Sequence, residues 1–304
     1  YQVPVEDGRN DITVSGENDF GYVTERSAMA LVKARKVPKA GVLRVAVIGI
    51  NAYPKLPEAC NGRACDLAFP VADAVAFLSV VAERTAPLFE RMESLVMVNR
   101  AALEAQPLRH AALAAQVDPA QIIEPESDEI EERLEEFLLA AGAEDTTIIF
   151  VAGHGMNLDE DYYLIPSDGQ KRGEKWRKSS LVDWEFVQEQ INDAIGRRIL
   201  VLDTCHAANA FNARLEKEAA DARVVVFSAT AANNTAAERK DLGHGIFTYA
   251  MLEGLRGRAD TSGDGVRLLG LADYVYREVL RLSDRRQEPV YHISQTANFL
   301  LARP

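Results

Sequence analysis

Short apolar runs rich in β-branched residues recur along this 304-residue chain, and helix-like segments separate them. The clearest runs are Leu43–Ile50, Thr146–Val151, Arg198–Leu202 and Arg223–Ser228. They are apolar at nearly every position, as is typical of strands that helices cover on both faces. Strands joined through helices need right-handed crossovers, which produce a mostly parallel sheet. The pattern therefore predicts an α/β protein.

Helical periodicity fills the segments between these runs. Helices are expected over residues 71–83, 107–117, 127–141, 184–195 and 268–282 and after Gly245, with further strands at 95–98 and 293–301. We therefore predict a three-layer α/β/α sandwich with a central sheet of about six strands, occupying residues 42–304. Residues 1–41 are polar and lack apolar periodicity, so we expect an N-terminal arm or linker there.

The composition excludes some classes of function. The net charge of −12 argues against a nucleic-acid partner, because phosphate binding needs a basic face. Uninterrupted apolar stretches of membrane-spanning length are missing, and we expect a cytoplasmic protein with no membrane contact. Three cysteines are too few for a disulfide scaffold; Cys60 and Cys65 either pair or remain buried thiols. Because the chain begins without Met, we expect a fragment or processed form, fused to or regulated by another domain.

Two motifs follow two of the predicted strands. Ala152-Gly-His-Gly155 comes after one, and Asp203-Thr-Cys-His-Ala207 after another. Parallel sheets place their chemistry at these strand ends, so His154 and Cys205 are expected to meet there. An imidazole that accepts the thiol proton makes Cys205 a nucleophile, and the Gly155 and Cys205 amides are candidate donors to an oxyanion. Taken singly, Cys205 is better explained as a small buried hydrophobic residue and His154 as a loop histidine; it is their placement at neighbouring strand ends that favours catalysis.

These motifs resemble those of the caspase-like (clan CD, peptidase C14) cysteine peptidases, since Cys205 follows His154 by 51 residues. Asp203-Thr-Cys-His206 is more similar to the metacaspase and bacterial caspase-like (orthocaspase) branch. Further matching segments are Val45–Tyr53, Tyr162–Asp168 and Gly243–Ala250, so the resemblance covers about residues 43–300. The sequence departs from the family at Ala152 and Ala207, where serine is usual or frequent. The resemblance implies the caspase-like fold.

Asp203 lies two residues before Cys205, so both side chains should project from the same face. A bare carboxylate there would hinder thiolate formation, whereas a pocket for a cationic side chain would explain it. The resemblance implies a preference for Arg or Lys before the cut, with Asp73 as the second pocket acid. The alternatives are a turn cap for Asp203 and a helix N-terminal acid for Asp73. Ser228 is expected either to line the pocket or only to end its strand.

Other segments carry weaker signals. Asp260–Gly265 resembles the start of a calcium loop, but Leu271 stands where the liganding glutamate belongs. His154, Cys205 and His206 have poor spacing for zinc, and His244 is expected to support a turn. We therefore expect no cofactor, while calcium activation at an unidentified site stays open. The basic segment 169–178 is either a solvated loop or a site of self-processing.

The sequence thus predicts a cysteine endopeptidase that acts on protein or peptide substrates with a basic residue at P1. The alternative is a non-catalytic signalling or scaffold module that retains the same fold.

Overall fold

The computed structural model describes residues 8–17, 23–32, 39–56, 59–60, 63–114, 117–159, 161–204, 224–230, 237–293 and 297–303. The chain divides into two units, residues 1–39 and 40–304. Within the first unit, β1 (Gly8–Glu17) and β2 (Val23–Val32) pair as an antiparallel hairpin. The sequence analysis did not anticipate these two strands, because their residues lack a clear apolar alternation.

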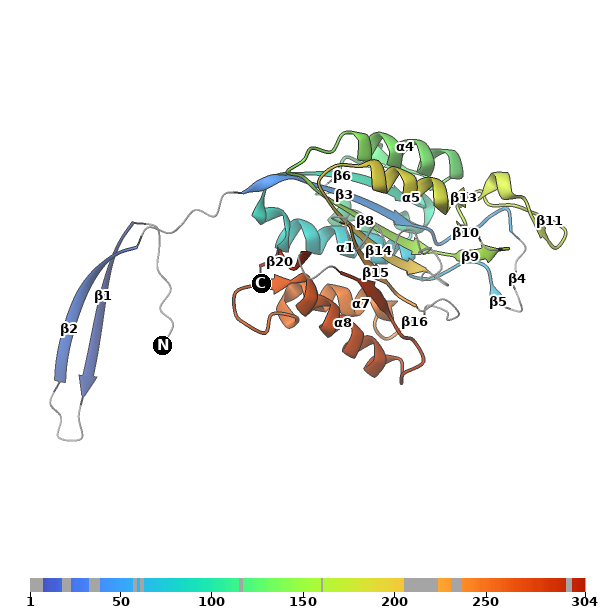
Figure 1. The fold of residues 1–304 in the computed structure, drawn as a ribbon. Helices are drawn as coiled ribbons and strands as arrows, with labels where there is room; N and C mark the ends of the chain where they lie inside the picture. The colour runs from blue at the N-terminus through green and yellow to red at the C-terminus, as the bar shows by residue number, and fades with distance from the viewer. Residues whose placement is uncertain are drawn as a thin grey trace. The chain divides into compact units, whose positions relative to one another are not determined.

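A seven-stranded sheet forms the centre of the second unit (Figure 1). Its strands lie in the order β19 (Val290–His292), β15 (Val224–Ser228), β14 (Arg197–Thr204), β8 (Thr146–Gly153), β3 (Ala40–Gly49), β6 (Phe89–Val98) and β7 (Ile122–Ile123). Every neighbouring pair is parallel except β15 with β19. The predicted α/β fold with a mostly parallel sheet is confirmed, with seven strands instead of about six.

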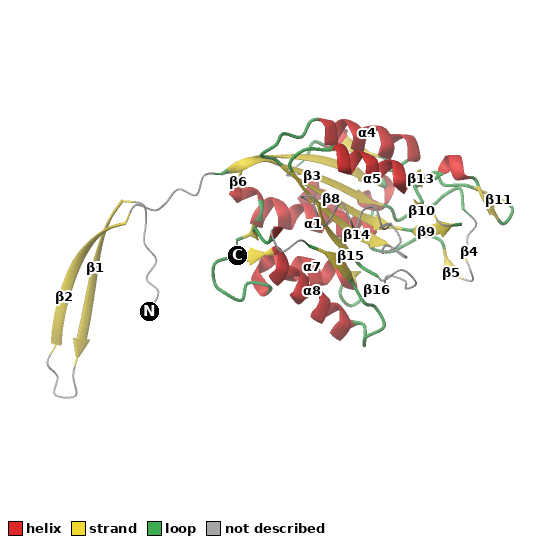
Figure 2. Cartoon of the chain, in the orientation of Figure 1, coloured by secondary structure: helices red, strands yellow, loops and turns green. Residues whose placement is uncertain are grey.

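Helices cover both faces of this sheet (Figure 2). On one face lie α1 (Pro70–Arg84), α7 (Ile246–Glu253) and α8 (Leu268–Leu282), and on the other lie α4 (Ser127–Leu139) and α5 (Trp184–Asp193). The other helices among the described residues are short: α2 (Arg100–Glu104), α3 (Pro107–Ala114), η1 (Ala86–Leu88), η2 (Pro119–Gln121), η3 (Lys178–Ser180) and η5 (Gly254–Arg258). The remaining strands are β4 (Ala59–Cys60), β5 (Arg63–Ala64), β9 (Gly155–Leu158), β10 (Asp161–Leu164), β11 (Lys171–Arg172), β12 (Lys175–Trp176), β13 (Val182–Asp183), β16 (Glu238–Arg239), β17 (His244–Gly245), β18 (Val266–Arg267) and β20 (Leu300–Ala302).

Strand alternation divides the core into two apolar layers. In β14, Ile199 and Val201 pack in the layer beneath α1, α7 and α8, whereas Leu200 and Leu202 pack in the layer beneath α4 and α5. Successive side chains of a strand point to opposite faces, so Asp203 continues the series of Ile199 and Val201. This register directs the Asp203 carboxyl toward the α1 and α7 side of the sheet.

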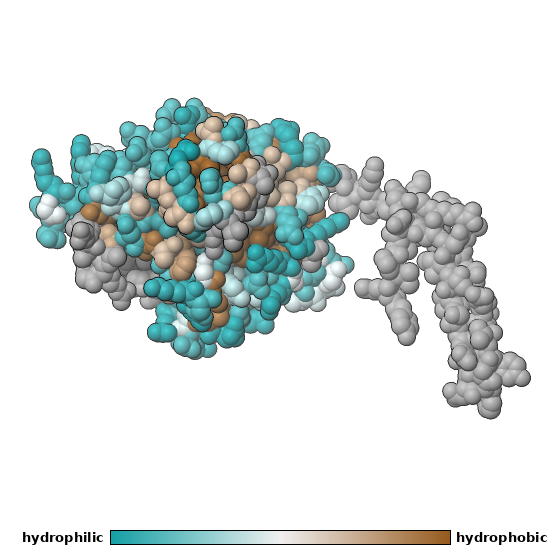
Figure 3. All heavy atoms as spheres, turned by 180° about the vertical axis from the view of Figure 1, so that it is seen from behind, coloured by the Kyte–Doolittle hydropathy of each residue, from teal (hydrophilic) through white to brown (hydrophobic). Residues whose placement is uncertain are grey.

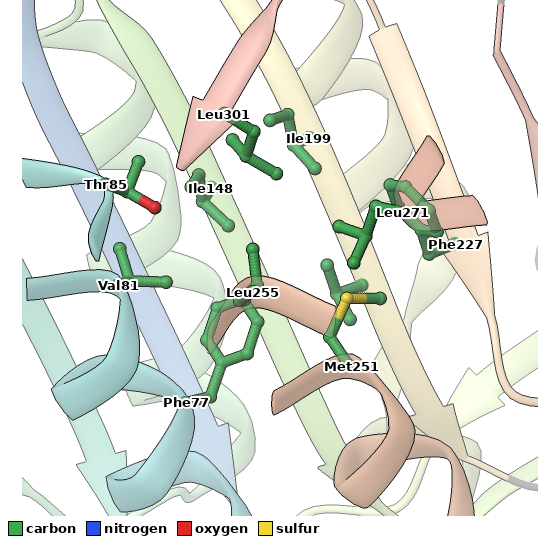
Figure 4. A pocket seen from close by; sticks show the side chains of 11 residues that line it. Phe77, Val81, Thr85, Ile148, Ile199, Phe227, Met251, Leu255, Leu271 and Leu301 are labelled. Atoms are coloured by element: carbon green, nitrogen blue, oxygen red, sulfur yellow. The ribbon is translucent and has the colours of Figure 1, made fainter. Parts of the chain in front are cut away.

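A small apolar cavity remains inside the first of these layers (Figure 4). Phe77 and Val81 of α1, Met251 of α7 and Phe227 of β15 are among the side chains that line it. Thr85 also lines it and is fully buried, and its hydroxyl has no hydrogen-bond partner among the described residues. A hydroxyl in apolar surroundings without a partner costs stability.

Two sequence predictions about this unit were wrong in detail. Ile195 was expected on the apolar face of a helix, but α5 ends at Asp193 and Ile195 is 56% exposed. The strand expected over 293–301 is instead two separate strands, β19 before it and β20 at its end.

The outer surface is mainly hydrophilic when seen from behind (Figure 3). Among the described helices, none is long and apolar enough to cross a membrane.

Candidate active site

The two motif-bearing strands are neighbours in the sheet. β8 and β14 run parallel, and Gly153 at the end of β8 pairs with Thr204 at the end of β14. The two strands therefore end at the same level, and His154 follows one of them directly. Cys205, the predicted nucleophile, follows the other and lies outside the described residues.

Backbone and side-chain contacts fix the His154 imidazole. Its Nε2 lies 2.7 Å from the carbonyl oxygen of Cys65. Because a carbonyl can only accept, Nε2 carries the proton and Nδ1 is the basic nitrogen. The His154 amide donates to the Tyr53 hydroxyl at 2.8 Å, and the Tyr53 ring lies 4.8 Å from the imidazole. Tyr53 is itself held by its amide, which donates to Asp66.

Burial lowers the pKa of His154 below its usual value, although the Cys65 carbonyl and the nearby Glu238 and Asp66 oppose this effect. The imidazole is therefore neutral at pH 7 and able to accept a proton. A neutral imidazole with a free Nδ1 is the form that a general base requires.

The Gly155 amide lies outside the local hydrogen-bond ladder. Gly155 pairs with Leu164 between the antiparallel strands β9 and β10, and the adjacent Ile165 amide donates to the His154 carbonyl. This donation makes Gly155 and Leu164 a non-hydrogen-bonded pair. The pairing of β9 with β10 therefore does not use the Gly155 N–H, which makes it a candidate donor next to His154 among the described residues.

A cleft beside His154 contains three acidic side chains among its lining residues, together with apolar residues and glycines. Its lining residues are Leu67, Pro70, Asp73, Ala152, Gly153, His154, Asp203, Ala237, Glu238 and Gly245. Two of the predicted pocket residues, Asp73 at the start of α1 and Asp203 at the end of β14, are thus brought together next to the predicted base. Among the described residues, the lining contains no lysine or arginine.

The Asp203 carboxyl is buried and partly satisfied. Its Oδ2 accepts hydrogen bonds from the Thr248 hydroxyl at 2.6 Å and from the Thr248 amide at 3.3 Å. Burial and the neighbouring Asp73 nevertheless raise the pKa of Asp203 to about 7. The structure therefore holds a carboxyl that a cation entering the cleft would ionise.

No role in the site was predicted for two residues of this region: Glu238, which lines the cleft, and His244, which contacts Asp73. His244, expected only to support a turn, lies with Nδ1 2.5 Å from Asp73 Oδ1 and donates to it. The Glu238 carboxylate accepts from the Ala68 and Phe69 amides at the start of α1. Neither role can be predicted from local sequence, because tertiary contacts bring β16 and β17 against α1. The local signals are that Glu238 is acidic and that His244 stands in a second Gly-His-Gly motif.

The remaining predicted residues have simpler surroundings. Ser228 is buried, donates to the Thr230 carbonyl at 3.0 Å, and is not among the lining residues of the cleft. Its predicted contact with substrate stays a prediction. Asp260 accepts from the amides of its own turn, including Gly263 and Gly265, which agrees with a polar turn. Within the described ranges, no three His, Cys, Asp or Glu side chains form a metal-binding group.

Cys65 is disulfide-bonded. Its partner and the side chain of Cys60 lie outside the described side chains, so the pairing of Cys60 with Cys65 is left open. The bond matters for the site because the Cys65 carbonyl holds His154.

Comparisons with known proteins identify the family and the fold. A family model described as Peptidase_C14, caspase domain, matches residues 43–300. Protein GSU0716 from Geobacter sulfurreducens superposes with a TM-score of 0.53 at 14% identity, covering 87% of this chain and 97% of that one. Caspase-1 from Spodoptera frugiperda superposes with a TM-score of 0.52 at 10% identity, covering 87% and 90% respectively. No curated protein matches the sequence. At these identities, the two structures show a shared fold.

Proposed function

Because the chain belongs to the caspase-domain family (peptidase C14), we propose that it is a cysteine endopeptidase that cleaves after arginine or lysine. Cys205 is the nucleophile and His154 the general acid and base. The Asp203-Thr-Cys-His206 motif supports assignment to the metacaspase and bacterial caspase-like branch. The observation that carries the proposal is the acidic cleft, in which Asp73 and Asp203 lie beside the neutral His154.

The chemistry follows from the His154 geometry. Nδ1 of His154 accepts the Cys205 thiol proton as Sγ attacks the scissile carbonyl carbon. The Gly155 and Cys205 amides donate to the oxyanion, and the imidazolium returns its proton to the leaving amine. A water molecule then gives its proton to His154 and attacks the acyl group, which releases the acid and restores the thiol. No cofactor enters these steps.

The acidic cleft supports a basic P1 residue. At an effective dielectric of about 20, a guanidinium about 4 Å from a carboxylate gains roughly 4 kcal/mol before desolvation is counted. An aspartate side chain would instead meet carboxylates of the same sign at Asp73, Asp203 and Glu238. We therefore infer that Asp73 and Asp203 receive the P1 cation, and that Glu238 adds negative charge at the rim of the cleft.

A panel of fluorogenic peptides that differ only at P1 tests the proposal. We expect hydrolysis of the Arg and Lys peptides, none of the Asp peptide, and a loss of about 10³-fold or more in kcat for Cys205→Ala and His154→Ala. Asp203→Asn should raise KM for the Arg peptide far more than it lowers kcat.

A complete lack of peptidase activity would favour the alternative, a non-catalytic signalling or scaffold module with the same fold. If the wild-type protein hydrolyses no peptide of the panel and Cys205 does not react with an arginyl chloromethylketone, the peptidase proposal is wrong.

A further inference from the structure

The hairpin formed by β11 and β12 carries dense positive charge in a chain whose net charge is −12. Between Lys171 and Lys178 there are five lysines and arginines and one glutamate. We propose that this segment, residues 171–178, hereafter the basic hairpin, is a docking surface for an acidic segment of the protein substrate. This proposal rests on the proposed peptidase function, but binding to the hairpin can be measured without catalysis.

Two like charges face each other at the tip of the basic hairpin. Arg172 pairs directly with Lys175 across the two strands, and both side chains are exposed. Like charges in directly opposed positions destabilise an antiparallel pair. Within the described part of the chain, neither side chain forms an ion pair with a carboxylate. A carboxylate from a partner that lies between them would replace this repulsion with two attractions.

The base of the basic hairpin is held in a defined position. Trp176 is half-buried against the α4 and α5 side of the core, and the Lys171 ammonium lies 4.6 Å from the centre of its ring. The Gln170 amide donates to Ser180 Oγ at 2.9 Å, and the Arg177 amide donates to the Gln170 carbonyl at 3.0 Å. The cations are therefore presented on an ordered support, which reduces the entropy lost on binding.

Lys178 connects this support to the strands that follow His154. Its ammonium lies 3.5 Å from Asp159 and 4.0 Å from Asp161, at the turn between β9 and β10, and over the Tyr163 ring. Because β9 begins directly after His154, the basic hairpin belongs to the same end of the sheet as the acidic cleft (Figure 1). A polypeptide whose basic residue occupies the cleft can extend toward the hairpin.

The size and setting of the hairpin favour an acidic polypeptide over a nucleic acid. Within the basic hairpin, the cations with no carboxylate partner among the described residues are Lys171, Arg172, Lys175 and Arg177. An extended peptide places alternate side chains about 7 Å apart, which suits a surface only two residues long on each strand. Beyond the hairpin the chain is strongly acidic, and this charge would repel a continuous phosphate backbone.

Fluorescence anisotropy with a fluorescein-labelled peptide of alternating glutamate and glycine tests the surface directly. We expect the wild-type protein to bind the peptide in a salt-sensitive way. R172E/K175E should bind it with an affinity at least about tenfold lower. R277E/R286E is the matched control, since it makes the same charge change on exposed arginines of α8 and the following turn. This control should bind as the wild type does.

Cleavage supplies the second readout. An arginyl peptide with an acidic extension on either side of the cut should have a lower KM than the unextended peptide, and R172E/K175E should remove that difference while leaving the unextended peptide unaffected. Three results would overturn the proposal: no binding of the acidic peptide to the wild type, equal binding to R172E/K175E, or tighter hairpin-dependent binding of a DNA oligonucleotide. If no peptide is hydrolysed but the hairpin still binds the acidic probe, the peptidase function fails and the docking surface stands.

Discussion

Asp203 and Asp73 converge on Gly245: a Cβ added at this glycine would lie 2.8 Å from Asp203 Oδ2 and 3.3 Å from Asp73 Oδ2. The two carboxyls are only 8% and 2% exposed, respectively. The neighbouring Asp73 raises the pKa of Asp203, while Asp73 itself contacts His244 Nδ1 and accepts from the Gly245 amide. A ligand cation that enters between them would lower the pKa of Asp203 again, as the proposed binding of a P1 cation requires.

The first prediction concerns the stability cost of Asp203. Well below pH 3.8 the carboxyl is protonated in both the folded and the unfolded chain. As the pH rises toward 7, the unfolded chain loses this proton while the folded protein retains it, so the wild type loses stability relative to Asp203→Asn. A rise in pKa from 3.8 to about 7 corresponds to roughly 4 kcal/mol at most. Thermal unfolding should show that the stability of Asp203→Asn relative to the wild type increases as the pH rises from 4 to 8. A variant that is less stable than the wild type at pH 8 would show that Asp203 supports the fold instead.

A second prediction links ligand binding to a proton. Agmatine carries the guanidinium of an arginine side chain, and its binding should require ionised Asp203. Since the pKa of Asp203 is about 7, the affinity should rise by about tenfold per pH unit below pH 7 and level off above it. Calorimetry in buffers of different ionisation enthalpy should detect the released proton at pH 6. Asp203→Asn should bind weakly and without this pH dependence; equal proton release by that variant would assign the proton to another group.

A third prediction tests the space between the two acids. Gly245→Ala places a methyl group too close to Asp203 Oδ2, so the carboxyl must shift. Overpacking of this kind costs about 1–3 kcal/mol. If this cost falls on substrate binding, KM for an arginyl peptide should rise by roughly 5- to 150-fold. The backbone of Gly245 has φ −59°, which alanine adopts readily, so thermal unfolding should confirm a folded variant. An unchanged KM would place the P1 side chain away from this glycine.

A fourth prediction concerns the apolar cavity in Figure 4. Thr85→Val replaces the buried hydroxyl with a methyl group of similar size, and should stabilise the protein by about 1–2 kcal/mol. Thr248→Val is the matched control, because its hydroxyl donates to Asp203 and its loss should not stabilise. Urea unfolding measures both. Destabilisation by Thr85→Val would mean that its hydroxyl has a partner outside the described residues.

The fifth prediction concerns the disulfide of Cys65. The proposed mechanism needs a free Cys205 thiol, so we expect Cys60 to be the partner and Cys205 to react with iodoacetamide. Peptide mapping by mass spectrometry under non-reducing conditions identifies the pair. A Cys65–Cys205 peptide would instead mean that the oxidised protein is inactive and that activity requires a reductant.

The central strands of the sheet, the longer helices and the position of Asp203 could be predicted from local patterns, whereas β1 and β2 could not, and the predicted role of Asp73 rested on the family resemblance. Successive side chains of β14 point to opposite faces of the sheet, and this rule places Asp203 on the same face as Ile199 and Val201. The helix over 268–282 was predicted at its observed bounds, since its apolar residues repeat with helical spacing. Local patterns failed where tertiary packing ends a helix early, as at Ile195.

Sequence alone determined the layered fold and the positions of His154 and Asp203 at neighbouring strand ends, because periodicity and strand order are local or follow from general rules of chain connection. Only the tertiary structure decided which nitrogen of His154 is the base, because the Cys65 carbonyl accepts from Nε2 and leaves Nδ1 as the base. Every residue has such a backbone carbonyl, so the sequence does not indicate which one contacts His154. It also brought His244 and Glu238 against the start of α1. Contacts between such distant segments depend on loop paths and packing, which leave no periodic pattern in the chain.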